Sequence, residues 1–148
     1  MSMVLHTSAG GIVYKKQAGK VLWLIGQHSQ HKGWVFPKGL VADQHQNERL
    51  DDAALREVEE EGGVKAKIIK LLPSPVSYIY RFEGQLTKKT VYYFLMEYVS
   101  GDPQNHDWEM SEAKFVTEEE AMQTLTYPSD KQAFTAALKL FTTQHETD

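Results

Sequence analysis

The 148-residue sequence contains no cysteine. This absence excludes a disulfide framework and a thiolate zinc site of the finger type. The first residues, Met1 to Thr7, also lack the basic and apolar regions of a signal peptide. Because neither feature points to secretion, we expect a cytoplasmic protein.

Long apolar runs and a basic excess are missing as well. No run approaches the roughly 20 apolar residues that a helix needs to cross a bilayer, so we expect no membrane partner. The formal net charge is −4, and no basic stripe is present to neutralise many phosphates, which argues against broad nucleic-acid binding. A small anionic ligand, bound by a metal ion and a few lysines, is compatible with this charge.

The chain length favours a single domain. A chain of 148 residues buries a core that is stable without disulfides, and no repeat, linker or low-complexity tract divides it. We expect one domain over residues 1–148, a frayed tail from about Thr143, and a monomer or homodimer as the assembly.

Apolar alternation predicts six strands, and turn residues separate several of them. Gly19 marks a hairpin turn within residues 17–20, and Glu83 with Gly84 marks another. The expected strands are Val4–Tyr14, Val21–Gln27, Ala66–Leu72, Val76–Phe82, Thr90–Val99 and Ala113–Val116.

Three helices are expected between and after these strands. The first runs from about Asn47 or Glu48 to Gly62. The other two begin at capping boxes, Thr117 with Glu120 and Ser129 with Gln132. Strands with interspersed helices indicate an α+β chain, arranged as an α/β/α sandwich around a central mixed sheet.

The most informative segment, residues 56–64 (REVEEEGGV), places four carboxylates within five residues, just before two glycines. At about 100° per residue, Glu57, Glu60 and Glu61 share one face of a helix. Arg56 is expected to point toward solvent. The three carboxylates therefore converge on one side of the helix.

Folding alone does not favour this arrangement. Glu57 and Glu61 repel each other at i, i+4 by roughly 0.2–0.5 kcal/mol. The negative end of the helix dipole opposes them too, because Gly62 and Gly63 stop the helix. Closely spaced, hard oxygen ligands suit Mg²⁺ or Mn²⁺, which hold and polarise phosphate oxygens. A solvated acidic helix face is the alternative interpretation.

The surroundings of these glutamates resemble the Nudix box, written G-x5-E-x7-R-E-U-x-E-E-x-G-U with U an aliphatic residue. The residues that match in type and spacing are Glu48, Arg56, Glu57, Val58, Glu60, Glu61, Gly63 and Val64. The first glycine departs from the pattern, because Gly39 stands nine residues before Glu48 instead of six, and Ala42 occupies the strict position. We take Gly39 as the equivalent, since Phe-Pro-Lys precedes it, so that residues 40–47 carry about three extra residues.

The resemblance to the Nudix family implies hydrolysis of a nucleoside diphosphate linked to another moiety, by water attack on phosphorus. It implies that Glu57, Glu60 and Glu61 are ligands of Mg²⁺ or Mn²⁺, with the carbonyl of Lys38 as a further ligand. Glu57 is alternatively the group that acts through water. Phosphoryl transfer depends mainly on positioning and charge neutralisation, which such residues provide.

Arg56 is a candidate catalytic residue that is expected to orient a carboxylate and not to touch the substrate. Its partner is either Glu60 at i+4 or Glu48, folding back from the start of the helix. Glu48 is accordingly expected to be structural.

A second carboxylate is usually recruited in this family from a loop before the last strand. Glu109 is the candidate, because it precedes Phe115 by six residues, a spacing that resembles that of diadenosine tetraphosphate hydrolases. Glu112 is the competitor. Two exposed loop acids without a catalytic role are the alternative interpretation.

Segments outside the box resemble the bis(5′-nucleosyl)-tetraphosphatase branch, which implies asymmetric hydrolysis of diadenosine tetraphosphate to ATP and AMP. Tyr78 and Tyr80 share one strand face and offer a stacking surface for adenine worth about 1–3 kcal/mol per base; half-buried sheet residues are the equal alternative. Lys38 and Lys89 are expected to bind the outer phosphates. His31, in the first polar loop, is a further candidate for that role.

The box does not distinguish among substrates of the family. Removal of pyrophosphate from RNA 5′ ends, or hydrolysis of a nucleotide sugar or inositol pyrophosphate, stays open. A non-enzymatic Nudix domain that senses nucleotides is a third possibility. The intact glutamates Glu57, Glu60 and Glu61 weigh against it, and the extra residues before the helix weigh slightly for it.

Overall fold

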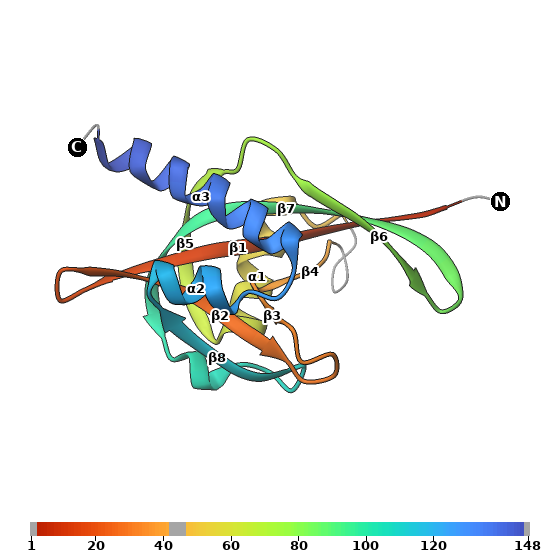
Figure 1. Cartoon of the computed structure of the whole chain (residues 1–148), viewed down its shortest axis with the longest axis horizontal. Coiled ribbons are helices and arrows are strands. Elements are labelled where there is room, and N and C mark those ends of the chain that lie inside the picture. The colour runs from red at the N-terminus through yellow and green to blue at the C-terminus, as the bar shows by residue number, and fades with distance from the viewer. Residues whose placement is uncertain (1–2, 42–46, 147–148) are drawn as a thin grey trace.

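The structure is a computed structural model that describes residues 3–41 and 47–146 (Figure 1). In this part of the chain the elements are β1 (Val4–Gln17), β2 (Lys20–His28), β3 (Trp34–Val35), β4 (Lys38–Leu40), α1 (Leu50–Gly62), β5 (Val64–Leu71), β6 (Val76–Phe82), β7 (Gln85–Gly101), the 3₁₀ turn η1 (Pro103–Asn105), β8 (Met110–Val116), α2 (Glu118–Thr124) and α3 (Pro128–Glu146). All six expected strands are present, and the two short strands β3 and β4 were not expected.

The described strands form one mixed, eight-stranded sheet. Its main path runs β3-β2-β1-β7-β5, while β4 pairs with β1, β6 with β7, and β8 with β2. The central pair, β1 and β7, is parallel, and every other pair is antiparallel. The central mixed sheet predicted from the sequence is therefore confirmed.

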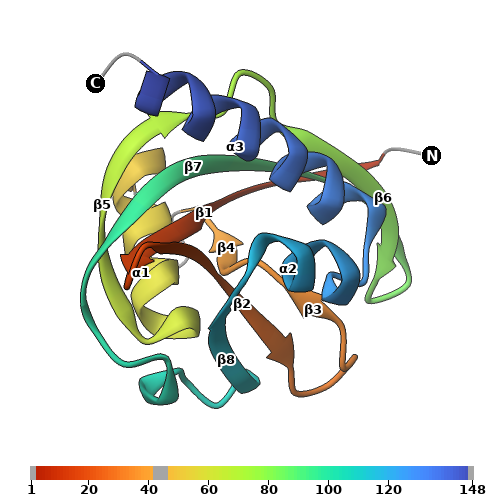
Figure 2. The same ribbon diagram turned by 60° about the vertical axis from the view of Figure 1, so that its left-hand side comes forward.

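Helices cover both faces of the sheet, as Figure 2 shows, with α1 on one side and α2 and α3 on the other. Side-chain alternation along β1 divides the core accordingly. Ala9 and Val13 pack with α1, whereas Ile12 and Tyr14 pack with α2 and α3. The predicted α/β/α sandwich is thus confirmed.

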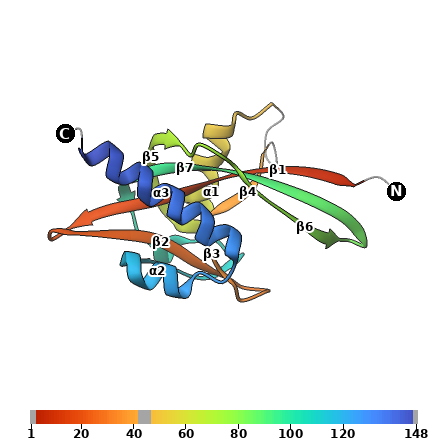
Figure 3. The same cartoon turned by 45° about the horizontal axis from the view of Figure 1, so that its top comes forward.

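The first part of β1, the start of β7 and the end of β6 extend beyond the helices as a long arm (Figure 3). The arm ends in the predicted turn, where Glu83 and Gly84 have φ values of 52° and 75°. The other predicted hairpin turn, at Ala18 and Gly19, also has positive φ at both positions. Such turns match the twist of the strands that they join.

The first helix begins later than expected, at Leu50 instead of Asn47 or Glu48. Asn47 has a left-handed φ of 66°, and Arg49 is extended, so neither residue can belong to the helix. Helix geometry therefore starts only after both. In the described part of the chain, no helix is long and apolar enough to cross a bilayer.

The capping box of Thr117 and Glu120 is present at α2, but the one predicted for Ser129 and Gln132 is wrong. Helix α3 begins at Pro128, whose fixed φ suits the first helical position, and Ser129 lies inside the helix.

The tail expected to fray from about Thr143 is helical to Glu146. His145 holds this last turn in place, because its ring packs against Tyr14 and Phe141, with ring centroids 5.8 and 4.0 Å apart.

Candidate active site

Helix α1 carries its glutamates at the edge of the hydrophobic cluster between this helix and the sheet. Ala53, Ala54 and Val58 are fully buried against the sheet, and this packing sets the rotation of the helix. As a result, Glu57 and Glu61 are buried as well. The helix ends at Gly63, which adopts the left-handed conformation (φ 74°) typical of a C-terminal glycine.

Arg56 connects the start of α1 to its acidic face. Its Nε and Nη2 donate to the two carboxylate oxygens of Glu48 at 2.8 and 2.9 Å. Its Nη1 donates to Oε2 of Glu57 at 2.7 Å and to Oε2 of Glu60 at 3.3 Å. The expectation that Arg56 points toward solvent is wrong, because only 15% of its side chain is exposed. Both partners considered from the sequence, Glu48 and Glu60, are bonded to it.

Glu57 lies beneath strand β4. Burial raises the pKa of Glu57 to about 7, against the opposing effect of the Arg56 charge and hydrogen bond. A Cβ atom at Gly39 would collide with the Glu57 carboxylate, so glycine lets β4 approach with this carboxylate in its present position. This contact supports Gly39 as the box glycine. Ala42 and most of the extra loop lie outside the described residues.

Glu61 is the second buried acid. Burial raises the pKa of Glu61 to about 8, although the Lys38 backbone N–H donates to its Oε1 at 3.2 Å and so favours the charged form. The charges of Glu57 and Glu109 raise it further. Two neighbouring acids with raised pKa values indicate negative charge that is poorly compensated, which is characteristic of functional sites.

The acidic face of α1 fits a divalent cation in its chemistry. In the described part of the chain, no three acidic or histidine side chains are placed to hold a metal ion as they stand. Glu57 and Glu60 are turned to Arg56, and Glu61 is bonded to Lys38. The potential metal ligands are nonetheless all oxygens, as Mg²⁺ or Mn²⁺ requires. Two of them belong to acids whose pKa values are raised. Metal binding by the three glutamates and the Lys38 carbonyl stays a prediction.

Glu109 lies in the turn before β8, and backbone hydrogen bonds connect this turn to the end of α1 and to the loop after β2. The Asp107 N–H donates to the carbonyl of Glu60 at 2.7 Å, and the Ser29 N–H donates to the carbonyl of Glu109 at 2.9 Å. The Glu109 charge contributes to the raised pKa of both buried acids of α1. The fold therefore brings Glu109 to the α1 glutamates.

Glu112, the competing acid, is exposed on β8. It pairs with Gln27 of β2, and its Oε2 lies 3.5 Å from Nζ of Lys114. This ion pair occupies it on the surface, which favours Glu109 as the second carboxylate.

The predicted substrate-binding residues of the arm lie on the sheet face that carries α3. Lys89 of β7 stands opposite Tyr78 of β6, and its Nζ lies 5.4 Å from the ring centroid of Tyr80. Burial lowers the pKa of Lys89, and the charge of Lys38 lowers it further, whereas Glu61 and Glu57 oppose this shift. The two lysines and the carboxylates thus act on one another.

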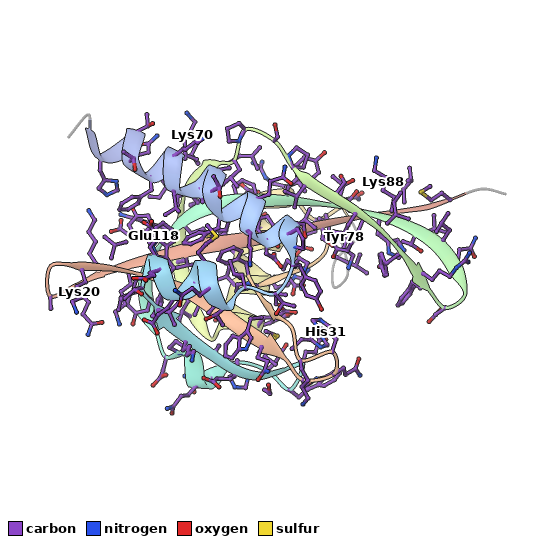
Figure 4. The ribbon with its side chains drawn as sticks, viewed as in Figure 1. Lys20, His31, Lys70, Tyr78, Lys88 and Glu118 are labelled. Atoms are coloured by element: carbon purple, nitrogen blue, oxygen red, sulfur yellow. The ribbon has the colours of Figure 1, made fainter. Side chains whose placement is uncertain are left out.

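The two tyrosine rings lie 5.8 Å apart and differ in their surroundings. Tyr78 packs against the core, where β6 passes α3, and its burial raises its pKa (Figure 4). Tyr80 faces Lys89 instead. Tyr78 is therefore in part the half-buried sheet residue of the alternative interpretation, and stacking of a base on either ring stays a prediction.

His31 lies in the loop between β2 and β3 and stacks on His28, with centroids 4.2 Å apart (Figure 4). Its Nδ1 accepts the Gly33 N–H at 3.0 Å and lies 2.9 Å from the Tyr127 hydroxyl. Burial lowers the pKa of His31, and the charges of His28 and Lys38 lower it further. A neutral ring that accepts at Nδ1 carries its proton on Nε2, which is the atom left to bind phosphate.

Asp130 was not identified from the sequence as part of this region. It is buried in the first turn of α3, where its Oδ1 accepts the Tyr93 hydroxyl at 3.0 Å. Burial raises the pKa of Asp130, and the charge of Lys38 opposes this shift. An aspartate near a helix start is common, so no local signal distinguished it.

Comparisons with known proteins agree with this geometry. The model of the NUDIX domain family matches residues 4–138. MutT4 of Mycobacterium tuberculosis, named as a mutator protein, is 30% identical over 137 residues, which cover 88% of this chain and 54% of that protein. An RNA pyrophosphohydrolase of Shewanella denitrificans is 35% identical over 82 residues, which cover 53% of this chain and 44% of that protein. The chain spans about half the length of these curated relatives.

Solved structures share the fold over nearly the whole chain. The Ap4A hydrolase of C. elegans superposes with a TM-score of 0.66 at 26% identity, covering 94% of this chain and 98% of that one. The NUDIX domain of Shewanella oneidensis NrtR, crystallised with ADP ribose, superposes with a TM-score of 0.72 at 19% identity, covering 95% and 90%.

Proposed function

Because the chain belongs to the Nudix family, we propose that it is a metal-dependent hydrolase that splits diadenosine tetraphosphate asymmetrically into ATP and AMP. The observation that carries this proposal is that two buried acids of α1, Glu57 and Glu61, act on the pKa of the half-buried Lys89. Such carboxylates require a cation, and such a lysine requires an anion. A divalent metal ion and a polyphosphate satisfy both.

The chain's own residues prepare the reaction. Glu57, Glu60 and Glu61, with the carbonyl of Lys38, would hold Mg²⁺ or Mn²⁺, which when bound neutralises phosphate oxygens and promotes attack at phosphorus. Arg56 fixes the direction of two of these carboxylates through its Nη1.

Hydrolysis forms a bond between water oxygen and phosphorus, breaks an anhydride P–O bond and releases a proton from the water. In this proposal the carboxylate that accepts the proton is Glu109 or Glu57. The pKa of Glu57, raised to about 7, suits a general base near neutral pH. Glu109 lies outside α1, so it can approach the reacting phosphorus from another side.

Substrate selection falls to the arm and the adjoining loop. Lys38 and Lys89 neutralise phosphates that are not attacked, and His31 offers Nε2 as a donor. Tyr80 and the exposed edge of Tyr78 provide a surface on which a base can stack. The similarity to an Ap4A hydrolase over almost the full length of both chains supports a substrate with a long phosphate bridge.

The test is a substrate panel with Mg²⁺ that compares diadenosine polyphosphates, ADP-ribose, nucleoside triphosphates and 5′-triphosphate RNA. We expect the highest kcat/KM for diadenosine tetraphosphate, with ATP and AMP as products and ¹⁸O from labelled water in AMP. The Glu61→Gln variant serves as the inactive control. Two ADP products, or equal activity in Glu61→Gln, would contradict the proposal.

RNA 5′-pyrophosphohydrolysis is the second candidate, favoured by the relative of that name over 82 residues. The net charge of −4 weighs against a long RNA, because few phosphates beyond the 5′ end would be neutralised. A strong preference for 5′-triphosphate RNA in the same panel would promote this activity to first place.

A further inference from the structure

Ser8 of β1 carries a buried hydroxyl without a partner. Its side chain is 0% exposed, and Oγ forms no hydrogen bond with any of residues 3–41 and 47–146. In the described part of the chain, no other buried side-chain nitrogen or oxygen atom lacks a hydrogen-bond partner. An unpaired buried hydroxyl costs about 1–3 kcal/mol, so its retention in a well-packed sheet requires an explanation.

The strand register places this hydroxyl between two lysines. Ser8 stands opposite Leu40 of β4 on one side and Val91 of β7 on the other. Lys38 stands two positions before Leu40, level with Gly10, and Lys89 stands two positions before Val91, level with His6; both side chains lie on the same face as Ser8. Ser8 is thus the diagonal neighbour of both.

Among the residues that the structure describes, no acceptor is bonded to Ser8 Oγ or to the amines of Lys38 and Lys89. The Lys89 amine lies over the Tyr80 ring, and among the described residues no carboxylate oxygen lies within 4.0 Å of the amine of Lys89 or Lys38. Each lysine can only donate, and Ser8 offers one further O–H donor. The missing partner is therefore an anion with several lone pairs, which a phosphate group supplies.

The position of this set separates it from the metal-binding acids. The Cα of Gly39 faces the carboxylate of Glu57 on one side of the sheet. The side chains of Lys38 and Leu40 project from the other side, which is also the side of Ser8. A phosphate bound there is consequently not the one that is attacked.

We propose that the Ser8 hydroxyl donates a hydrogen bond to a substrate phosphate held between Lys38 and Lys89, and that this subsite selects substrates with a phosphate beyond the reacting pair. The inference rests on the proposed function, because it takes the bound chain to be a polyphosphate. It makes Ser8 a specificity-determining residue.

The test uses inorganic tripolyphosphate as the probe, in metal-free buffer, with binding measured by calorimetry and stability by thermal melting. Ser8→Ala is compared with Thr87→Val, a second buried hydroxyl on the same face whose Oγ1 is already satisfied by the carbonyl of Gln85 at 3.1 Å. Ser8→Ala should weaken tripolyphosphate binding about tenfold and leave the melting temperature unchanged or higher, because no bond of the free protein is lost. Thr87→Val should lower the melting temperature and leave the affinity unchanged.

Three outcomes overturn the inference: no binding by the natural protein, unchanged affinity in Ser8→Ala, or a melting temperature of Ser8→Ala as low as that of Thr87→Val. If Ser8→Ala does not fold, Ser8→Cys provides the same comparison, since the thiol is similar in shape but a weak donor. The probe contains no nucleoside and is not hydrolysed in this assay. If the protein hydrolyses no nucleotide but Ser8→Ala still weakens tripolyphosphate binding, only the proposed hydrolase activity is refuted. If the protein is active but Ser8→Ala leaves tripolyphosphate binding unchanged, only the proposed phosphate subsite is refuted.

Discussion

Arg56 and Glu48, eight residues apart, form a two-bond ion pair in which Nε and Nη2 contact the two carboxylate oxygens at 2.8 and 2.9 Å. Only 6% of the Glu48 side chain is exposed, so the pair is poorly screened by solvent. The remaining Nη1 binds Glu57 and Glu60. We therefore expect Glu48 to act on the acidic face of α1 through Arg56, as a positioning residue.

Glu48→Gln should cost about 1–3 kcal/mol of stability, because one charged acceptor of a buried pair becomes neutral. Its kcat should fall less than about tenfold, since Glu48 touches neither substrate nor metal ion. Urea unfolding and steady-state kinetics measure the two effects. Glu118→Gln, at an exposed position of α2, is the control, and a hundredfold loss of kcat in Glu48→Gln would instead assign it a direct catalytic role.

Glu60→Gln and Glu61→Gln should each lower kcat by about 10²-fold or more while the fold stays intact, because each removes charge without changing shape. The rise in melting temperature on adding Mg²⁺ should disappear in both. A thermal shift titration with Glu59→Gln, an exposed glutamate of the same helix, provides the comparison. Near-normal turnover at saturating Mg²⁺ in either variant would refute metal binding by that residue.

The stability of the metal-free protein should depend on the pKa of Glu61, which burial raises to about 8. For a carboxyl whose pKa is raised on folding, the folded state binds the proton more tightly than the unfolded state. Its stabilising contribution is therefore present below the ordinary pKa and is lost as the pH rises through about 8. Melting in EDTA from pH 5 to pH 8.5 should show a decline that is shallower in Glu61→Gln, and identical slopes would contradict the raised pKa.

Glu109→Gln should impair catalysis more than Glu112→Gln, because the turn that carries Glu109 is bonded to the end of α1 through Asp107 and the Glu109 charge acts on the acids of α1. The pH profile of kcat measures this, since loss of a base changes its acidic limb. A larger defect in Glu112→Gln would move the second carboxylate to that position, and no defect in either variant would make both acids bystanders.

Tyr78→Ala and Tyr80→Ala should raise KM for diadenosine tetraphosphate more than they lower kcat, because a base held far from the reacting phosphorus contributes mainly uniform binding. Ile79→Ala, on the opposite face of the same strand, is the matched control. If only kcat changes, the rings act on the reacting centre or on the fold and not as a stacking surface. Stability measurements on Tyr78→Ala separate these two, since Tyr78 also packs against the core.

The fold was predictable to the extent that it follows from local periodicity. The long strands and α1 appear where alternation and helical spacing place them, and the turns at Gly19 and Gly84 appear where chain reversal requires positive φ. The short strands β3 and β4 escaped prediction because two or three residues carry no measurable period. Their pairing partners lie on β2 and β1, so only the assembled sheet defines them.

By itself, the sequence determined the chemical character of α1. The spacing of Glu57, Glu60 and Glu61 is a local property of one helix, and the resemblance to the Nudix box depends on the same local spacing. Only the tertiary structure decided what surrounds these acids. Gly39 over Glu57, and Ser8 between Lys38 and Lys89, depend on the pairing of β1 with β4 and β7. Segments up to about 80 residues apart in the chain pair there. The pairing is made by backbone hydrogen bonds, which depend little on the side chains, so no local sequence pattern encodes which residues face one another.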